Sequence, residues 1–336
     1  MKISASLYSS KQRSITQLVD ELDKCHIDFF HIDCNDDPSV FEDIAAIKKI
    51  SKTPIDLHII SDRPEFYLPL IKEHEVDYVT FQFENLKGKK LNLPTYKKTT
   101  WGLAIVSDTP VEVFEEYKEE CDFILMMTTT PGQSGGTFRK DNFKRIRKFR
   151  NKYSQKKIHV DGGVNDETGF ILRILGVHSV VSGSYLVNHE SIGAALLHLR
   201  SSIIHSDFHI KDFMIDVQDA PVLPIKDLNV PQVIKHIDDY NLGFTLLSDA
   251  GKKLAGISSN ADVRKGLLKH LDNFNNIALD DIINKHPVYI NENASISELL
   301  QLIQSKSFLI SYLPVVNNEM ELTGALSFIN LIRSES

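Results

Sequence analysis

Short hydrophobic runs alternate with amphipathic segments over the first two hundred residues. The runs are rich in β-branched and aromatic residues, which is typical of buried strands. They span residues 2–8, 28–34, 54–60, 77–83, 99–106, 121–128, 156–164 and 177–187. The segment after the first run places Ile15, Leu18 and Leu22 at helical spacing, and most of the other gaps have a similar pattern. The pattern therefore predicts eight strands that alternate with helices.

This alternation predicts an α/β fold with a parallel sheet, either closed into a (β/α)8 TIM barrel or open and doubly wound. No Gly-x-Gly-x-x-Gly follows the first strand, which disfavours the dinucleotide-binding form of the open sheet. The gap at residues 84–98 contains a Gly and a Pro, so a loop or a stunted helix is expected there. We expect a barrel domain over residues 1–205.

Polar residues stand at the ends of three of the predicted strands. His31 and Asp33 point to the same face of the second strand, since side chains alternate along a strand. His58 lies near the end of the third strand and Asp161 near the end of the seventh. Any one of these residues alone would usually be a hydrogen-bonded interior or surface group. Together, at the carboxyl ends of barrel strands, they predict a divalent metal site for Zn, Mn, Fe or Co.

Three segments that contain glycine lie at or after the ends of the last three predicted strands or within them. They are TTPGQSGGTF after strand six, DGGV at the end of strand seven, and SGS at residues 182–184, within strand eight. Glycine lets backbone N–H groups approach an anion closely, and barrels often bind phosphate in the loops after strands seven and eight. These turns predict a phosphorylated substrate. The contacting residues expected in them are Gly132, Gln133, Ser134, Gly135, Gly162, Gly163, Gly183 and Ser184.

A set of motifs in fixed order covers about residues 1–200. It comprises ISASL at the first strand, HID at the second, DLHI at the third, GLAIVSDTPVE at the fifth, MTTTPGQSGGTF at the sixth, VDGGVN at the seventh and VSGS at the eighth. As a set, these motifs resemble those of the ribulose-phosphate 3-epimerases. The resemblance implies that His31, Asp33, His58 and Asp161 bind the metal. It further implies that Asp33 and Asp161 act as acid and base, and that Ser6 and His58 contact the substrate.

The resemblance implies inversion of C3 in a ketose phosphate, with ribulose 5-phosphate to xylulose 5-phosphate as the favoured reaction of pentose phosphate metabolism. Inversion beside a carbonyl requires one acid/base group on each face of the substrate and a stabilised enediolate. Two alternatives stay open. One is another sugar-phosphate reaction, such as aldol-type cleavage, and the other is a non-catalytic sugar-phosphate sensor.

The sequence departs from the family pattern around the substrate. Asn35 stands where the family usually has Met, Ile60 replaces another Met, and Gln82 replaces a usual His after strand four. The family's PGFGGQ becomes PGQSGG at residues 131–136. The cap over the substrate is thus partly rebuilt with polar groups, which leaves a related ketose phosphate possible.

The rest of the chain has a different pattern. Residues 206–222 are expected to form a linker, and residues 223–336 contain two similar segments, at 243–267 and 311–333. Each segment predicts a strand, a turn, a second strand that begins at Gly256 or Gly324, and a helix.

This repeat resembles tandem CBS domains, which implies a smaller α+β domain that binds an adenine or cytidine nucleotide. By the resemblance, Ser259 and Asp262 would hold the ribose and phosphate, while Asn330 replaces the usual Asp in the second repeat. The alternative is that the pair only joins chains into a homo-oligomer, with Asp262 as a helix cap.

Composition and charge narrow the class of protein. The length of 336 residues suits two domains, and the net charge of -7 argues against nucleic acid or a membrane as main partner. One stretch, residues 139–157, contains ten Lys/Arg and the single acid Asp141. We expect it to form the solvated face of a helix, with a polyanion-binding patch as the alternative.

The sequence shows no predicted targeting segment and no paired-cysteine motif. The N-terminal residues lack an apolar signal core, and no apolar run is long enough to span a membrane. Cys25, Cys34 and Cys121 form no Cys-x-x-Cys pair, which suits a reducing compartment. A cytoplasmic location is therefore expected.

Overall fold

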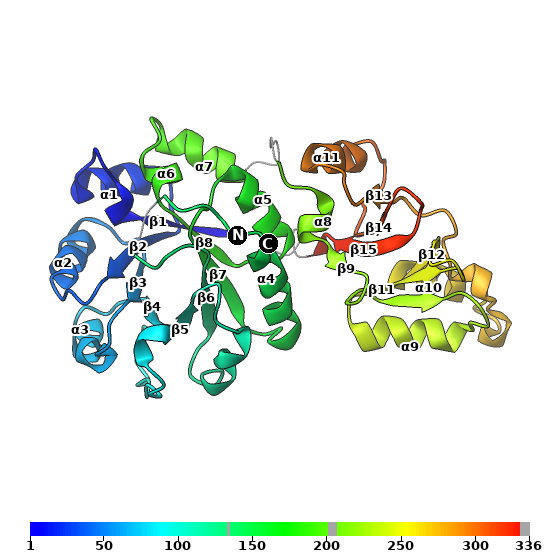
Figure 1. Ribbon diagram of the computed structural model, residues 1–336, viewed down its shortest axis with the longest axis horizontal. Coiled ribbons are helices and arrows are strands. Elements are labelled where there is room, and N and C mark those ends of the chain that lie inside the picture. Colours follow the sequence, from blue (N-terminus) through cyan, green and yellow to red (C-terminus); the bar gives the residue numbers. More distant parts are fainter. Residues whose placement is uncertain (133–134, 201–206, 330–336) are drawn as a thin grey trace. The chain divides into compact units, whose positions relative to one another are not determined.

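The computed structural model describes residues 1–132, 135–200 and 207–329 (Figure 1). The described residues divide into two compact units, one that ends at residue 200 and one that begins at residue 207.

The first unit is built on a closed barrel of eight parallel strands in sequential order (Figure 1). The strands are β1 (Lys2–Ser6), β2 (Phe29–Cys34), β3 (Ile55–Ile59), β4 (Tyr78–Gln82), β5 (Thr100–Ile105), β6 (Phe123–Met127), β7 (Lys157–Asp161) and β8 (Ser179–Ser182). Strand β1 pairs with both β2 and β8, which closes the sheet. The predicted barrel is confirmed and the open, doubly wound sheet is excluded.

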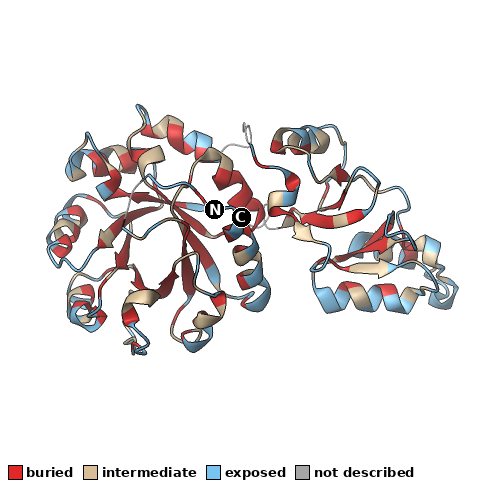
Figure 2. Ribbon diagram, in the orientation of Figure 1, coloured by how far each residue is buried: buried red, intermediate tan, exposed pale blue. Residues whose placement is uncertain are grey.

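Helices surround this barrel on the outside (Figure 1). They are α1 (Ile15–Lys24), α2 (Val40–Ile50), α3 (Leu68–Glu73), α4 (Asp141–Lys152), α5 (Asp166–Ile174), α6 (Ser184–Val187) and α7 (Ile192–Arg200), with 3-10 turns η1 (Leu7–Ser9), η2 (Pro64–Tyr67), η3 (Phe83–Leu86) and η4 (Val111–Glu116). After β4 only the short turn η3 forms, as the Gly and Pro of residues 84–98 predict. Most of each barrel strand is buried (Figure 2).

Helix α1 shows why these segments fold as they do. Ser14 and Gln17 form a capping box, which satisfies two backbone N–H groups at the first turn. The same helix buries Leu18, Val19 and Leu22 against the barrel side of its surface. The capping box thus fixes where the helix begins, and the apolar stripe fixes which face of the helix packs against the barrel.

The eighth strand is shorter than the sequence pattern predicts. Strand β8 ends at Ser182, and residues 184–187 form helix α6. The carbonyl of Gly183 accepts hydrogen bonds from the backbone N–H groups of Leu186 and Val187, so the chain turns into a helix there. The prediction that Gly183 and Ser184 lie within the strand is therefore wrong: Gly183 is the N-cap of α6 and Ser184 is its first residue.

The basic stretch forms helix α4, whose Phe143, Ile146 and Phe149 are buried. Some of its positive charge is paired within the barrel unit. Lys148 lies 2.7 Å from Glu112, and Arg145 donates to backbone carbonyls of the loop before η4.

Within the described residues, no helix is long and apolar enough to cross a membrane.

The second unit consists of two small sheets with the strand orders β10-β11-β12 and β13-β14-β15-β9 (Figure 1). The strands are β9 (Ile215–Asp216), β10 (Val222–Pro224), β11 (Phe244–Ser248), β12 (Leu254–Ser259), β13 (Ile290–Asn291), β14 (Tyr312–Val316) and β15 (Leu322–Ser327); the helices are α8 (Ile210–Phe213), α9 (Val230–Tyr240), α10 (Asn260–Lys269) and α11 (Ile296–Gln304), with turns η5 (Phe274–Asn276) and η6 (Leu279–Asp281). The unit is therefore a small α+β region, as the repeat predicts.

The two repeats match element by element. In each, a parallel strand pair is followed by an antiparallel pair, β10-β11-β12 in the first and β13-β14-β15 in the second. Both antiparallel pairs contain a register shift at the equivalent place, between Leu247 and Ser248 and between Val315 and Val316. The second strand of each pair begins two residues before the predicted Gly256 or Gly324. The helix start expected near Asn330 lies outside the described residues.

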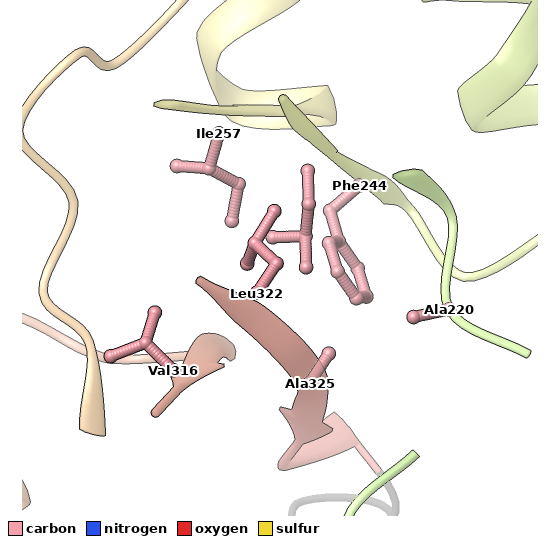
Figure 3. Packing of buried hydrophobic residues seen from close by; sticks show 7 residues of the cluster. Ala220, Phe244, Ile257, Val316, Leu322 and Ala325 are labelled. Carbon is pink, nitrogen blue, oxygen red and sulfur yellow. The ribbon is translucent and has the colours of Figure 1, made fainter. Parts of the chain in front are cut away.

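The repeats share one core (Figure 3). It is formed by Ala220, Phe244, Leu246 and Ile257 from the first half and by Val316, Leu322 and Ala325 from the second. Phe244 also stacks on Tyr312, with ring centroids 4.4 Å apart. Each sheet buries part of its apolar face against the other, so the two repeats pack as one unit.

The segment expected as a linker contributes structure to this unit. Strand β9 pairs antiparallel with β15, with Ile215 opposite Ala325. Helix α8 and residues 209–211 bond to the loop between β13 and α11, as in the hydrogen bond from Ile210 N to Ala294 O. Short strands of two or three residues give too little periodicity to be seen in a sequence, which explains the difference.

Candidate active site

Four side chains gather at the carboxyl ends of three strands. His31 and Asp33 come from β2, His58 from β3 and Asp161 from β7. One ligand atom from each residue lies within 4.8 Å of all the others. Two imidazole nitrogens and two carboxylate oxygens at such distances are a donor set that fits a divalent transition metal.

His31 is oriented by a carboxylate, that of Asp56, which is not among the predicted site residues. Its Nδ1 lies 3.0 Å from Oδ2 of the buried Asp56, which also accepts from the Ser4 hydroxyl at 2.9 Å. Burial opposes ionisation of Asp56, but His31 holds the pKa of this carboxyl below its usual range. The signal was present in the sequence, because Asp56 and His58 alternate onto the same face of β3.

The other nitrogen of His31 supports a metal site directly. Nε2 is buried and makes no hydrogen bond, although it lies 3.4 Å from Asp33 and 3.7 Å from Asp161. A buried nitrogen without a partner is costly unless another group satisfies it. A cation held among these oxygens would do so. The metal that the sequence pattern implies therefore fits the residues present.

Burial alone would raise the pKa of both carboxyls. For Asp33, the neighbouring His31 and His58 outweigh burial, and its pKa lies well below the usual range. For Asp161, burial dominates; His31 opposes it and the charge of Asp33 adds to it, so the pKa of Asp161 rises to about 6. The two neighbouring carboxyls thus have pKa values shifted in opposite directions. Enzymes use such a difference to make one carboxyl a base and the other an acid.

A pocket lies at this mouth of the barrel. It is lined by Ser6, Tyr8, Ser9, Asp33, Thr129, Gly132, Gly135, Gly136, Asp161, Gly162, Gly163, Val164, Val181, Gly183, Ser184 and Tyr185. The lining joins both carboxyls of the cluster to the glycine turns after β6, β7 and β8. One pocket therefore contains the residue types needed for proton transfer and for anion binding.

Glycine is required in the turn after β7. Gly162 and Gly163 have φ angles of 109° and 62°, which side chains rarely adopt. A Cβ at Gly163 would lie 2.4 Å from the backbone nitrogen of Phe138, and one at Gly162 would lie 2.2 Å from Oγ1 of Thr129. The turn after β7 is thus packed directly against the loop after β6.

Most of the predicted substrate contacts lie together. Ser6, Gly132, Gly135, Gly162, Gly163, Gly183 and Ser184 all line the pocket. His58 is fully buried behind them, with Nδ1 3.2 Å from Asp33. Gln133 and Ser134 lie outside the described residues. Their roles toward a substrate stay predictions.

The structure adds pocket residues for which the sequence gives little signal. Tyr8, Ser9, Thr129 and Tyr185 also line the pocket. Ser9 shares a hydrogen bond of 2.9 Å with Ser6. These residues occur in a loop, in the turn η1 and in the four-residue helix α6, which are too short for periodicity to mark the face that they present.

In the second unit, Ser259 and Asp262 form a capping box at the start of α10. The Ser259 hydroxyl accepts from the backbone of Asp262, and the Asp262 carboxylate accepts from the backbone N–H and the hydroxyl of Ser259. Ser259 is therefore the N-cap of α10 and Asp262 is its capping-box partner at N3, whereas the alternative prediction had Asp262 as the cap. Contact with a nucleotide stays a prediction, and Asn330 lies outside the described residues.

The closed parallel barrel and the His–Asp cluster at its mouth define a (β/α)8 barrel with a candidate metal centre. The model of the ribulose-phosphate 3 epimerase family matches residues 2–187, so the chain belongs to this family. The CBS domain model matches residues 279–336.

Curated relatives cover the barrel. The chain is 27% identical over 229 residues to the ribulose-phosphate 3-epimerase of Methanocaldococcus jannaschii, across 63% of this chain and 97% of that protein. It is 24% identical to the Bacillus subtilis enzyme over 218 residues, across 60% of this chain and 99% of the relative.

Among solved structures, CBSX2 in complex with AMP is 20% identical, with a TM-score of 0.32, over 38% of this chain and 96% of that one.

Proposed function

We propose that the barrel is a metal-dependent epimerase that inverts C3 of a ketose phosphate, with ribulose 5-phosphate to xylulose 5-phosphate as the favoured reaction. The observation that carries the proposal is that Asp33 and Asp161 belong to one cluster of potential metal ligands and line one pocket. Family membership supports the same reaction type.

The chemistry requires a base on one face of C3 and an acid on the other. One carboxylate removes the C3 proton, and the electron pair moves into the C2–C3 bond while the C2 oxygen gains negative charge. The second carboxyl then delivers a proton to the opposite face of C3. Asp33 on β2 and Asp161 on β7 come from different strands of the barrel, so they can approach a substrate from two directions.

His31, His58 and the two aspartates would hold the divalent cation. When bound, the cation supplies positive charge that stabilises the developing enediolate. The protein contributes the rest of the arrangement. Asp56 orients His31, and the glycine turns after β6, β7 and β8 offer backbone N–H groups to the phosphate of the substrate.

Two carboxyls at the pocket also weigh against a purely sensory barrel. Binding a sugar phosphate does not require acid/base groups from two strands, whereas inversion does. Aldol-type cleavage would break a carbon–carbon bond and release two products, which the same assay distinguishes from inversion.

The experiment is incubation of the metal-loaded protein with ribulose 5-phosphate in deuterated water. Inversion through proton removal places deuterium at C3 and produces xylulose 5-phosphate, both of which NMR detects. The Asp161→Asn variant, with its metal content measured, serves as the control. Metal-replete protein that neither exchanges the C3 hydrogen nor forms a second ketose phosphate would contradict the proposal.

A further inference from the structure

His58 contacts the candidate metal cluster with Nδ1 and a glutamine with Nε2. Its Nδ1 lies 3.2 Å from Oδ1 of Asp33, and its Nε2 lies 2.8 Å from Oε1 of Gln82. Both rings are thus held from behind, His31 by Asp56 and His58 by Gln82. The two histidines face the cluster with different nitrogens, Nε2 for His31 and Nδ1 for His58.

The orientation of the Gln82 amide follows from its surroundings. Its Nε2 donates to Oε2 of Glu84 and lies 3.5 Å from the carbonyl oxygen of Ala104, and both of these atoms are acceptors. An amide NH2 cannot accept a hydrogen bond. The nitrogen of the Gln82 amide must therefore face Glu84 and Ala104, which leaves its oxygen toward His58.

Glu84 is itself fixed as an acceptor. Its Oε1 accepts from the backbone N–H of Val106 at 3.1 Å and from the hydroxyl of Thr109. Both oxygens of Glu84 are thus engaged by donors from Gln82 and from the loop after β5. This arrangement removes the freedom of the Gln82 amide to turn over.

We infer that Gln82, held by Glu84, is a positioning residue that fixes the tautomer of His58 and thereby prepares its Nδ1 as a metal ligand. An amide oxygen accepts only, so it requires the ring proton on Nε2. The lone pair on Nδ1 then faces Asp33 and the cluster. Gln82 is 2% exposed and His58 is fully buried, so water does not compete for this hydrogen bond.

This role rests on the proposed metal-dependent function and adds a residue at which the chain departs from the expected His. A neutral amide behind His58 differs from the carboxylate behind His31, since a charged acceptor raises the basicity of a ligating imidazole and an amide does so less. The site would therefore hold its cation with one strongly polarised and one weakly polarised histidine.

The test compares Gln82→Met with a swapped variant that combines Gln82→Glu and Glu84→Gln. The methionine has similar length and removes the acceptor. In the swapped variant, the new carboxylate at position 82 accepts from His58, and the new amide at position 84 donates to it while its oxygen still accepts from Val106 and Thr109. The exposed Gln304→Met, in α11, is the matched control.

Two readouts are independent of catalysis. The dissociation constant for Zn²⁺ is measured by competition with a chromogenic chelator, and the protonated ring nitrogen of His58 is identified by nitrogen-15 NMR of the zinc-loaded protein. Gln82→Met should weaken Zn²⁺ binding by about 10- to 100-fold, the usual effect of losing such an outer partner. The swapped variant should recover most of this loss and keep the proton on Nε2.

Two outcomes would overturn the inference. One is a Gln82→Met protein with the dissociation constant and ring signature of the wild type. The other is a folded swapped variant that binds Zn²⁺ no better than Gln82→Met, since position 82 would then matter only for packing. The C3-exchange assay tests the proposed function separately, so a metal-binding loss in Gln82→Met without any epimerase activity would still support this inference.

Discussion

The Nδ1 atom of His31 lies 3.0 Å from the carboxylate of Asp56, which lies inside the barrel behind the candidate metal cluster. This contact leaves Nε2 as the ring atom that faces Asp33 and Asp161. Asp56→Asn should keep the shape and lower the basicity of His31, so Zn²⁺ affinity should fall by about 10- to 100-fold. Chelator competition measures this. Ser4→Ala, which removes the other partner of Asp56, should have a smaller effect; equal effects would contradict a specific role for the carboxylate.

The cluster predicts a stoichiometric metal. Purified protein loaded with Zn²⁺, Mn²⁺, Fe²⁺ or Co²⁺ should carry about one ion per chain, because one set of four ligands lies within 4.8 Å. His58→Ala should lose most of that metal, as measured by elemental analysis after dialysis. Full activity in metal-free protein would rule out the assignment.

Asp33 and Asp161 are expected to be the acid and base. Asp33→Asn or Asp161→Asn should lower turnover by about 100- to 10,000-fold, the range for loss of such a group. Metal content must be measured in each variant, because both residues are also candidate ligands. A metal-replete Asp161→Asn protein with normal turnover would remove that residue from the mechanism.

Gly183 is the most informative position for the phosphate. A Cβ there would lie 2.6 Å from the Ser9 hydroxyl oxygen, so Gly183→Val should displace Ser9 and obstruct the pocket. We expect the KM to rise by about tenfold or more through lost anion contacts, which corresponds to about 1.4 kcal/mol of binding free energy. Gly193→Ala, whose added Cβ would meet only ordinary contacts, is the control. An unchanged KM would place the phosphate elsewhere.

The second unit is predicted to bind an adenine or cytidine nucleotide through Ser259 and Asp262. A ligand that binds only the folded state raises Tm with concentration. Because Asp262 is also the N3 residue of the α10 capping box, where it accepts from the backbone N–H of Ser259, Asp262→Ala should by itself lower the stability of the folded unit. Glu298→Ala removes the equivalent N3 residue of the α11 capping box and is the matched control. Only Asp262→Ala should abolish the nucleotide-dependent shift; no shift in the wild type would leave capping as the role of Asp262.

The sequence predicted the barrel and the metal cluster because both depend on simple periodicity. Eight short apolar runs set the strands, and the shared face of His31 and Asp33 follows from the alternation of side chains along a strand. The strand that was predicted too long, β8, ends where Gly183 turns the chain, and a single glycine does not reveal which conformation it adopts.

The parts that were missed depend on contacts across strands. Asp56 behind His31 and Gln82 behind His58 become outer partners only once β2, β3 and β4 lie side by side in register. Gln82 departs from the family pattern in the sequence, but its hydrogen bond to Glu84, and that of Glu84 to Thr109, join residues at or after the ends of two different strands. No linear pattern predicts which amide atom would face a histidine.

The pairing of β9 with β15 has a consequence for anyone who transplants the second unit onto another enzyme. The segment that leads out of the barrel supplies an edge strand to the sheet of the last repeat, so the module begins near residue 207 and not at residue 223. A graft that starts at the first repeat would expose the edge of β15 and invite pairing with foreign chains. A graft that keeps residues 207–222 retains β9, which covers the edge of β15.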